Sequence, residues 1–417
     1  MLIQLLYNFF IKIYVFNIYL ASFFNKKALC WVSGRKGIFA RMRSELKQEQ
    51  SPIIWFHAAS LGEFEQGRPV IEAIKDKVPH YRILLTFFSP SGYEVRKDYQ
   101  NADYIFYLPS DTTENARKFL DIVQPELTVF IKYEYWFNYL KELHKRALPH
   151  CFISSVFSPT HYFFKFYGQW GLNKLKNVSH FFVQDETSMA LLKKHGISQV
   201  SVSGDTRFDR VSKITHQPKD FNQVAAFAKN HKVIIAGSTW PADDKLIFEF
   251  LRKSTYPLKY IIAPHDINAA YIERLKNKTT PKGCLFTELT TENAPNHNIL
   301  IINGMGYLSH IYRYADIAYI GGGFGKGIHN ILEAACWGLP VFFGPNHKKF
   351  SEAVKLIEIN GAFSINSSEE MLMQVNKLLK EPKYYSKVSE NNKTYVNNNS
   401  GATQKIVNTL FDKYLKN

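Results

Sequence analysis

The chain has 417 residues, of which 46% are hydrophobic, and its formal net charge is +16. This length predicts two domains of ordinary size, each with a core of its own. The basic surplus favours an anionic partner, such as a phosphorylated substrate, an acidic membrane or a nucleic acid. The four cysteines are scattered without disulfide-framework or zinc-ligand spacing, so neither kind of scaffold is expected.

The first 24 residues form an apolar run that is long enough to cross a bilayer, which takes about 20 residues. Lys12 interrupts the run, and Lys26 and Lys27 follow it. Basic residues next to a span stay in the cytoplasm, which would place the rest of the chain on that side. Because a lone lysine inside a span is costly, a helix that lies on the membrane is an equal alternative, and both arrangements stay open here.

Short apolar segments that are typical of strands alternate with helical segments. In the first half these apolar segments are residues 53–57, 83–87, 104–107 and 127–131. The alternation predicts parallel α/β sheets. Polar residues 211–221 contain one proline and indicate a linker between two α/β halves. The expected parts are an anchor at residues 1–24, α/β domains at 25–210 and 211–400, and a last helix at 401–417.

Residues 57–63, with the sequence HAASLGE, follow the first strand, and Glu63 stands at the start of a helix. The carboxyl end of a parallel strand is where α/β proteins bind ligands. The helix dipole should keep the Glu63 carboxylate ionised near neutral pH, so that it can accept a proton as a general base. An acidic residue is also a common helix start without a catalytic task, and the pattern alone does not decide between the two interpretations.

Two further segments of the first half have both an ordinary and a functional interpretation. Glu134 follows the strand at residues 127–131, and by composition alone an acid there is more often a solvated loop residue. Residues 160–176 mix aromatic side chains with lysines. This segment fits an ordinary amphipathic helix or a patch that faces lipid.

A glycine-rich loop follows the strand expected at residues 317–320. Its glycines are Gly321, Gly322, Gly323, Gly325 and Gly327. We expect a helix to begin at His329, and a strand, a glycine loop and a helix N-terminus together bind phosphate. A plain crossover turn would need one or two glycines, so the loop favours a ligand site. No Asp-x-Asp motif is present in this half, and we therefore expect neither a divalent metal nor another cofactor.

Two stretches, residues 57–63 and 319–345, resemble the Kdo transferases. These are B-type glycosyltransferases that move 3-deoxy-D-manno-octulosonic acid (Kdo) from CMP-Kdo to a lipid A precursor. The first stretch has the family's His-x-x-Ser-x-Gly-Glu pattern. The second has its main elements at Gly322-Gly323, His329-Asn330, Leu332-Glu333, Gly338-Leu339-Pro340-Val341 and Gly344-Pro345. Ile328 stands where the family has a glycine.

The resemblance implies that Glu63 is the catalytic base and that Glu134 and Arg207 also belong to the catalytic site. The family has a lysine at the position of Arg207, and these two cations are not interchangeable at shaped sites. The family's arginine before the histidine is missing at Pro264-His265, and Tyr307 replaces an acid. The implied donor-binding residues are Gly237, Ser238, Pro264, His265, Met305, Gly306, Tyr307, Gly322, Gly323, His329, Asn330, Ile331, Leu332 and Glu333.

The resemblance also implies an architecture, a reaction and a location. The expected fold has two Rossmann-like domains that face each other across a cleft, with the last helix packed back on the first domain. The expected activity is inverting transfer of Kdo to lipid IVA on the cytoplasmic face of the inner membrane, without nucleic acid as a partner. Two alternatives remain: a B-type transferase or epimerase that uses a UDP-sugar, and a non-catalytic basic protein that binds membrane or nucleic acid.

Overall fold

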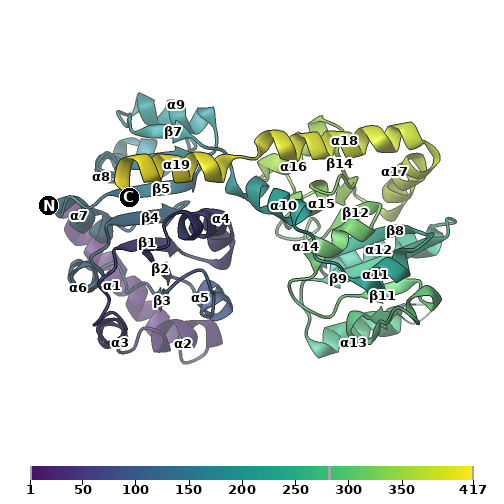
Figure 1. Ribbon diagram of the computed structural model, residues 1–417, viewed down its shortest axis with the longest axis horizontal. Coiled ribbons are helices and arrows are strands. Elements are labelled where there is room, and N and C mark those ends of the chain that lie inside the picture. The colour runs from purple at the N-terminus through teal and green to yellow at the C-terminus, as the bar shows by residue number, and fades with distance from the viewer. Residues whose placement is uncertain (1, 280–282, 416–417) are drawn as a thin grey trace. The chain divides into compact units, whose positions relative to one another are not determined.

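The computed structural model describes residues 2–279 and 283–415. The chain forms two compact units, one of residues 1–209 with 400–417 and the other of residues 210–399. Each unit has a parallel sheet of seven strands with helices packed around it, which confirms the expected α/β fold (Figure 1). Buried parallel strands of this kind consist of almost continuous apolar residues, as the sequence has them.

In unit 1 the strands run in the order β3-β2-β1-β4-β5-β6-β7. They are β1 (Ile53–Ala58), β2 (Arg82–Phe87), β3 (Tyr104–Tyr107), β4 (Leu127–Ile131), β5 (His150–Ser155), β6 (His180–Val183) and β7 (Val200–Val202). The helices are α1 (Leu2–Ala21), α2 (Lys26–Ser33), α3 (Ile38–Glu45), α4 (Leu61–Lys77), α5 (Pro90–Arg96), α6 (Thr113–Val123), α7 (Phe137–Lys145), α8 (Gln169–Leu175) and α9 (Glu186–Lys194).

Strand β1 lies between β2 and β4 inside this sheet and sends alternate side chains to two apolar layers. Ile54 and Phe56 belong to one buried cluster, and Trp55 belongs to the other. His57 therefore points to the same side as Trp55, because successive side chains of a strand face opposite sides. This alternation places a buried imidazole at the carboxyl end of β1.

Unit 2 repeats the architecture in the order β10-β11-β9-β8-β12-β13-β14. Its strands are β8 (Lys232–Thr239), β9 (Leu258–Pro264), β10 (Cys284–Leu285), β11 (Ile299–Ile301), β12 (Ile317–Ile320), β13 (Val341–Phe343) and β14 (Ala362–Ser364). Its helices are α11 (Asn222–Ala228), α12 (Pro241–Lys253), α13 (Ala269–Lys278), α14 (Leu308–Ile311), α15 (Leu332–Ala335), α16 (Ser351–Glu358), α17 (Ser368–Lys380) and α18 (Pro382–Asn399).

The connection between the units differs from the expected polar linker at residues 211–221. Helix α10 (Thr206–His216) occupies more than half of that stretch, and the division between the units falls inside it. The residues before Pro218 are good enough helix formers to continue a helix, and the only proline of the stretch lies beyond its end.

The last helix, α19 (Ala402–Tyr414), belongs to unit 1 and packs against α4. Its buried residues Ile406, Val407 and Leu410 join the apolar cluster that contains Ile71 and Val129. The Asp209 carboxylate accepts hydrogen bonds from the backbone N–H of Gly401 and from Thr403, which fixes the point where α19 begins. The helix is thus part of the unit 1 core, although it is separated from it in sequence by all of unit 2.

We predict that Leu410→Ala destabilises unit 1 by about 2–5 kcal/mol, because it leaves a cavity in a fully buried layer. Denaturant unfolding, followed by a probe in unit 1, measures the loss. The exposed residue Lys405 in the same helix provides the control, and Lys405→Ala should change stability by less than about 0.5 kcal/mol. Equal effects of the two substitutions would show that α19 is not part of the core.

Candidate active site

Each sheet reverses its winding at one place, and both glycine-containing motifs lie there. In unit 1 the reversal lies between β1 and β4, and in unit 2 it lies between β8 and β12. Loops from the two neighbouring strands diverge at such a point and leave room beyond their carboxyl ends, where open α/β sheets bind ligands. Residues 57–63 leave β1 at this point in unit 1, and the glycine loop leaves β12 at the corresponding point in unit 2.

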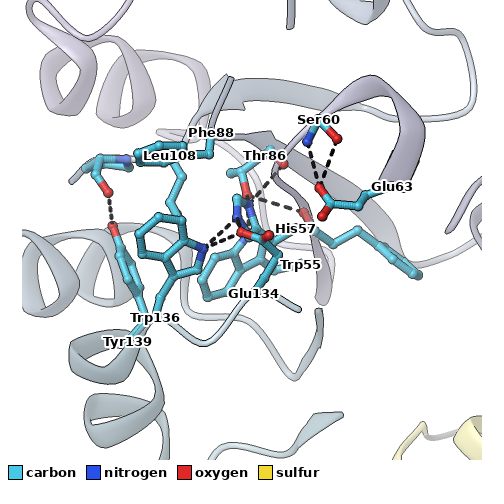
Figure 2. A network of polar contacts seen from close by, with 12 residues as sticks. Trp55, His57, Ser60, Glu63, Thr86, Phe88, Leu108, Glu134, Trp136 and Tyr139 are labelled. Carbon is cyan, nitrogen blue, oxygen red and sulfur yellow. Dashed lines mark hydrogen bonds and ion pairs between the residues drawn. The ribbon is translucent and has the colours of Figure 1, made fainter. Parts of the chain in front are cut away.

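A buried hydrogen-bond network joins the ends of β1, β2 and β4 (Figure 2). His57 Nδ1 lies 2.8 Å from the hydroxyl and 3.1 Å from the carbonyl oxygen of Thr86, its neighbour across the sheet. On the other side of the ring, Nε2 lies 3.2 Å from Glu134 Oε2. The Trp136 indole N–H donates to Glu134 Oε2 at 2.8 Å and to His57 Nε2 at 3.0 Å.

His57 and Glu134 are neighbours within this network. Nδ1 of His57 faces both a hydroxyl, which can donate or accept, and a carbonyl oxygen, which only accepts, so the roles of the two ring nitrogens follow from the tautomer. Glu134 is 7% exposed, and its partners fix the carboxylate in place. Glu134 is therefore a buried, oriented group and not a solvated loop acid.

Glu63 is the third residue of α4, and its carboxylate closes the start of that helix. Oε2 accepts hydrogen bonds from the Ser60 N–H at 2.9 Å and the Ser60 hydroxyl at 3.1 Å. Neither of these bonds involves Oε1. The helix-capping interpretation of Glu63 is thus correct, and one carboxylate oxygen remains for a second task.

The expectation that Glu63 stays ionised near neutral pH is wrong. Burial raises the pKa of the Glu63 carboxyl to about 7, and the negative charge of Glu134 adds to the rise. The bonds from Ser60 and the charge of Lys132 act in the opposite direction but are smaller. A carboxyl with such a pKa is partly protonated at pH 7 and can both take up and release a proton there, as general acid–base groups do.

Arg207 lies near Glu63 but is engaged by an acid of its own. It stands at the start of α10, and its guanidinium pairs with Asp205 at 2.7 and 2.8 Å. Tyr133 links the two regions: burial raises its pKa, the charges of Asp185 and Glu63 raise it further, and Arg207 lowers it. The structure therefore brings Glu63, Glu134 and Arg207 to the same end of unit 1.

In unit 2 three aromatic rings stack beyond the carboxyl ends of β8, β9 and β12. Trp240 and His329 lie edge to edge, and the His265 ring stacks against both, with its centroid 4.6 Å from that of Trp240 and 4.4 Å from that of His329. Trp240 Nε1 donates to His329 Nε2 at 2.9 Å, so that nitrogen carries no hydrogen. Burial lowers the pKa of His329 to about 4, and the neighbouring His265 lowers it as well. Trp240 and His265 are exposed and present a flat aromatic surface.

Backbone packing explains two glycines of the loop. A Cβ at Gly322, where φ is +92°, would lie 2.4 Å from the Gly327 carbonyl oxygen, and one at Gly323 would lie 2.5 Å from the Gly344 nitrogen. The Gly322 N–H donates to the buried Asp243 carboxylate at 2.9 Å. The N–H groups of Gly325, Gly327 and His329 also donate within the loop. Gly322 and Gly323 thus serve close packing, and fewer N–H groups of the loop are left for a ligand than we expected.

The helix after the glycine loop differs from the expectation. Helix α15 begins at Leu332 instead of His329 and has only four residues. One turn carries little of the dipole that a long helix directs at an anion. Asn330 donates to Glu333 at 3.1 Å and accepts from the Leu332 N–H at 3.1 Å, and Arg210 lies 3.6 Å from Glu333. Asn330 and Glu333 therefore begin the helix as a pair.

The remaining expected donor contacts are not all in one place. Gly237 and Ser238 lie at the end of β8, Pro264 ends β9, and Ile331 and Leu332 are buried beneath the loop. Met305 and Gly306 are exposed. The Tyr307 ring packs on Phe286 and Phe221, with centroids 4.8 and 5.8 Å away. Tyr307 thus has a structural role that an acid at this position would not have.

The site residues expected from the sequence did not include Thr86, Trp136, Arg210 or Trp240. Trp240 follows a strand of the second sheet directly, and that position was the only signal for it. In the described ranges, no group of three or more His, Cys, Asp or Glu side chains is arranged to hold a metal ion. The geometry as a whole offers a proton-accepting carboxyl in unit 1 and an aromatic surface beside a glycine loop in unit 2.

Known proteins resemble this chain in sequence and in fold. Residues 34–210 match the family described as 3-deoxy-D-manno-octulosonic-acid transferase (kdotransferase). The 3-deoxy-D-manno-octulosonic acid transferase of Haemophilus influenzae is 26% identical over 86% of this chain and 86% of its own length. The Rickettsia felis enzyme is 28% identical over 94% of this chain and 84% of its own length. The Aquifex aeolicus enzyme is 26% identical over 78% of this chain and 86% of its own length.

Among solved structures, UDP-GlcNAc 2-epimerase from Neisseria meningitidis superposes with a TM-score of 0.61. It has 17% sequence identity and covers 87% of this chain and 100% of its own, so it supports the two-sheet fold and nothing more specific. These three sequence relatives are all transferases of one kind. Over most of its length, the chain is thus similar in sequence to the Kdo transferases, a family of glycosyltransferases.

Proposed function

We propose that this protein transfers Kdo from CMP-Kdo to lipid IVA with inversion at the sugar carbon. The observation that carries the proposal is Glu63, whose carboxyl lies at the switch point of unit 1 with a pKa of about 7 and one oxygen not engaged by Ser60. The names of the curated relatives support the sugar that is transferred. In this proposal residues 25–210 bind the acceptor, and residues 211–400 bind the donor at a membrane surface.

The chemistry needs one proton acceptor and one stabilised leaving group. An acceptor hydroxyl attacks the anomeric carbon of Kdo from the side opposite to the phosphate, and its proton passes to Glu63 Oε1. The bond between that carbon and the phosphate oxygen breaks, and CMP leaves with both electrons. The proton on Glu63 then returns to solvent. Glu134 does not accept this proton, but its charge keeps the affinity of Glu63 for a proton high.

Unit 2 offers two features for a nucleotide. The exposed Trp240 and His265 rings can stack on the cytosine, because any base has a flat π-face. Lys326 and Lys349 lie along the glycine loop, and the Lys349 ammonium donates to the Lys326 carbonyl oxygen. These cations, together with Arg210 beside Glu333, would oppose the negative charge that grows on departing CMP. Because α15 has only one turn, its dipole would stabilise the charge on departing CMP less than we expected from the sequence.

Release of CMP tests the proposal directly. The full chain is incubated with CMP-Kdo in the presence and absence of lipid IVA, and with UDP-GlcNAc in a parallel reaction. We expect CMP to appear at a rate that depends on lipid IVA, and we expect no conversion of UDP-GlcNAc. Acceptor-dependent conversion of UDP-GlcNAc instead of CMP-Kdo would contradict the proposal, as would the absence of turnover of both.

Glu63→Gln should lower turnover by about 10²- to 10⁴-fold, which is the usual contribution of a general base. Glutamine can still accept the Ser60 N–H, so the melting temperature should stay near that of the wild type. Steady-state rates and a thermal melt on the same preparation give the result.

The matched control is Ser60→Ala, which removes a capping hydroxyl and keeps the base. It should cost about 1 kcal/mol of stability and leave turnover within a few-fold of the wild type. If Ser60→Ala and Glu63→Gln both lower stability and both leave turnover almost unchanged, Glu63 only caps the helix.

The rate should fall as the pH decreases through about 7, because protonated Glu63 cannot act as a base. Glu134→Gln removes a charge that raises the pKa of Glu63. The acidic limb of the pH–rate profile should therefore move to lower pH, whatever happens to the maximal rate. The exposed residue Glu114 is a control, since Glu114→Gln leaves both groups untouched. An acidic limb that stays in place in Glu134→Gln would show that the two carboxyls do not interact.

Trp240→Ala should weaken CMP binding by roughly 5- to 150-fold, as the loss of about 1–3 kcal/mol of base stacking implies. Trp240→Phe keeps a ring on which a base can stack and should lose much less. Isothermal titration calorimetry with CMP measures both. The Trp240 side chain is 42% exposed, so neither substitution should disturb the core. Equal affinities of the alanine variant and the wild type would remove Trp240 from the donor site.

A further inference from the structure

Helix α1 is in contact with unit 1 along its whole length. Six of its described positions and one in the turn after it are partly buried, while the positions between them are exposed. The partly buried side chains are Gln4, Tyr7, Asn8, Ile11, Val15, Ile18 and Ser22. Residues three and four apart lie on the same side of a helix. The partly buried positions therefore form one continuous stripe from the first turn to the last, with which the helix rests on the domain. Figure 1 shows α1 as part of unit 1.

Hydrogen bonds connect the first half of this stripe to unit 1. The Tyr7 hydroxyl donates to Asp111 at 2.5 Å. Gln4 donates to Asn138 at 3.0 Å, and Asn138 donates to Asn8 at 2.9 Å. Asp111 and Asn138 are 1% and 2% exposed. Three polar side chains of an apolar helix thus find partners in buried polar groups of the domain and not in solvent.

Aromatic and apolar contacts continue the stripe. The Tyr7 ring meets Phe137 edge-on at 5.3 Å and lies 5.8 Å from Trp170. Tyr14 stacks on Phe88 with an angle of 20° between the rings. Val15 borders a cavity of about 460 Å³ whose other walls include Arg35 and Arg43. The helix is therefore held at its start, its middle and its second half.

The opposite face of α1 is apolar and exposed. Its side chains include Leu6 at 46%, Phe9 at 58%, Ile13 at 38%, Phe16 at 59% and Leu20 at 45% exposure. Lys12 follows Asn8 by four residues and precedes Val15 by three, so it stands at the edge of the docked stripe. From that edge a lysine can reach the headgroups while its stem stays in apolar surroundings.

The surface next to α1 also combines exposed aromatic side chains with basic ones. Phe166 is 94% exposed and Tyr167 is 64% exposed, three or four residues before Trp170, which packs against Tyr7. On the other side, Arg35 donates to three backbone carbonyl oxygens and pairs with no carboxylate in the described chain. Together with Arg43 it gives the cavity beside Val15 a positive lining. Such cations suit the phosphates of anionic lipids.

A helix that crosses a bilayer is surrounded by hydrocarbon for about 30 Å, the length of α1 itself. If α1 crossed a membrane as it stands, the buried Asp111–Asn138 region and the side of unit 1 would have to enter the hydrocarbon with it, at a cost that no contact offsets. We propose that α1 lies in the plane of one leaflet, with its docked stripe on unit 1 and its apolar face in the lipid. This arrangement does not depend on the proposed reaction.

Spin-label depth measurements separate this arrangement from a span. Single cysteines replace Leu6, Ile13 and Leu20, which are seven residues apart on the exposed face. The background is full-length Cys30→Ser, since the other native cysteines are buried. The protein is bound to vesicles of phosphatidylethanolamine and phosphatidylglycerol. Met373→Cys, at an exposed apolar position of unit 2, is the control that should stay in water.

We expect the three labels to have one common depth, about 5–10 Å below the headgroup boundary. A spanning helix would instead give the greatest depth at position 13 and shallow values at positions 6 and 20. That profile would overturn the proposal, and so would three labels that remain in water.

The lipid-facing surface has an independent test. Phe9→Glu should weaken binding to the same vesicles by about tenfold or more, because it places a charge in the apolar layer. Met373→Glu changes a side chain of similar exposure, 62% against 58%, and should leave binding unchanged. Both variants should melt like the wild type, since neither side chain is buried. Unchanged vesicle binding by Phe9→Glu would refute the assignment of this face to lipid.

Discussion

The contact between His57 and Glu134 is the interaction on which the site in unit 1 depends. It connects the ends of two neighbouring strands, and Thr86 and Trp136 complete it on either side. A buried carboxylate without such partners would be strongly destabilising. With them, a negative charge is held near Glu63 at a fixed place, and the pKa of Glu63 rises beyond what burial alone would give. The chemistry assigned to Glu63 thus depends on a carboxylate that follows a neighbouring strand.

In unit 2 a different buried acid, Asp243, holds the parts of the site together. Asp243 accepts hydrogen bonds from the Tyr319 hydroxyl, the Gly322 N–H and the Trp240 N–H. One carboxylate therefore ties the end of β12, the glycine loop and the residue that begins the aromatic stack. The positions of the loop and of Trp240 are coupled, because both depend on this acid. A nucleotide that stacks on Trp240 would meet a loop whose backbone is already fixed.

The sequence predicted the elements that depend on local pattern. The apolar strands, the two-sheet architecture and the helix start at residues 60–63 all follow from spacing and composition, and the family resemblance located both motifs. Neither the local pattern nor the resemblance could predict properties that arise from tertiary contacts. The raised pKa of Glu63 needs Glu134 from another strand, and the aromatic stack needs side chains from three strands. The glycine loop misled us about α15, because glycines that permit backbone packing and glycines that cradle phosphate look alike in sequence.

The way in which α1 packs on unit 1 could likewise not be predicted from the sequence. An apolar run with a few polar interruptions is consistent with a span or a surface helix, and only the partners of Gln4, Tyr7 and Asn8 distinguish them.

The proposed reaction is tested most directly by mass spectrometry of lipid IVA after incubation with CMP-Kdo and the purified full-length protein. We expect a product heavier by whole Kdo residues, with one CMP formed for each residue added. Unchanged lipid IVA under conditions in which the protein is folded and binds CMP would contradict it.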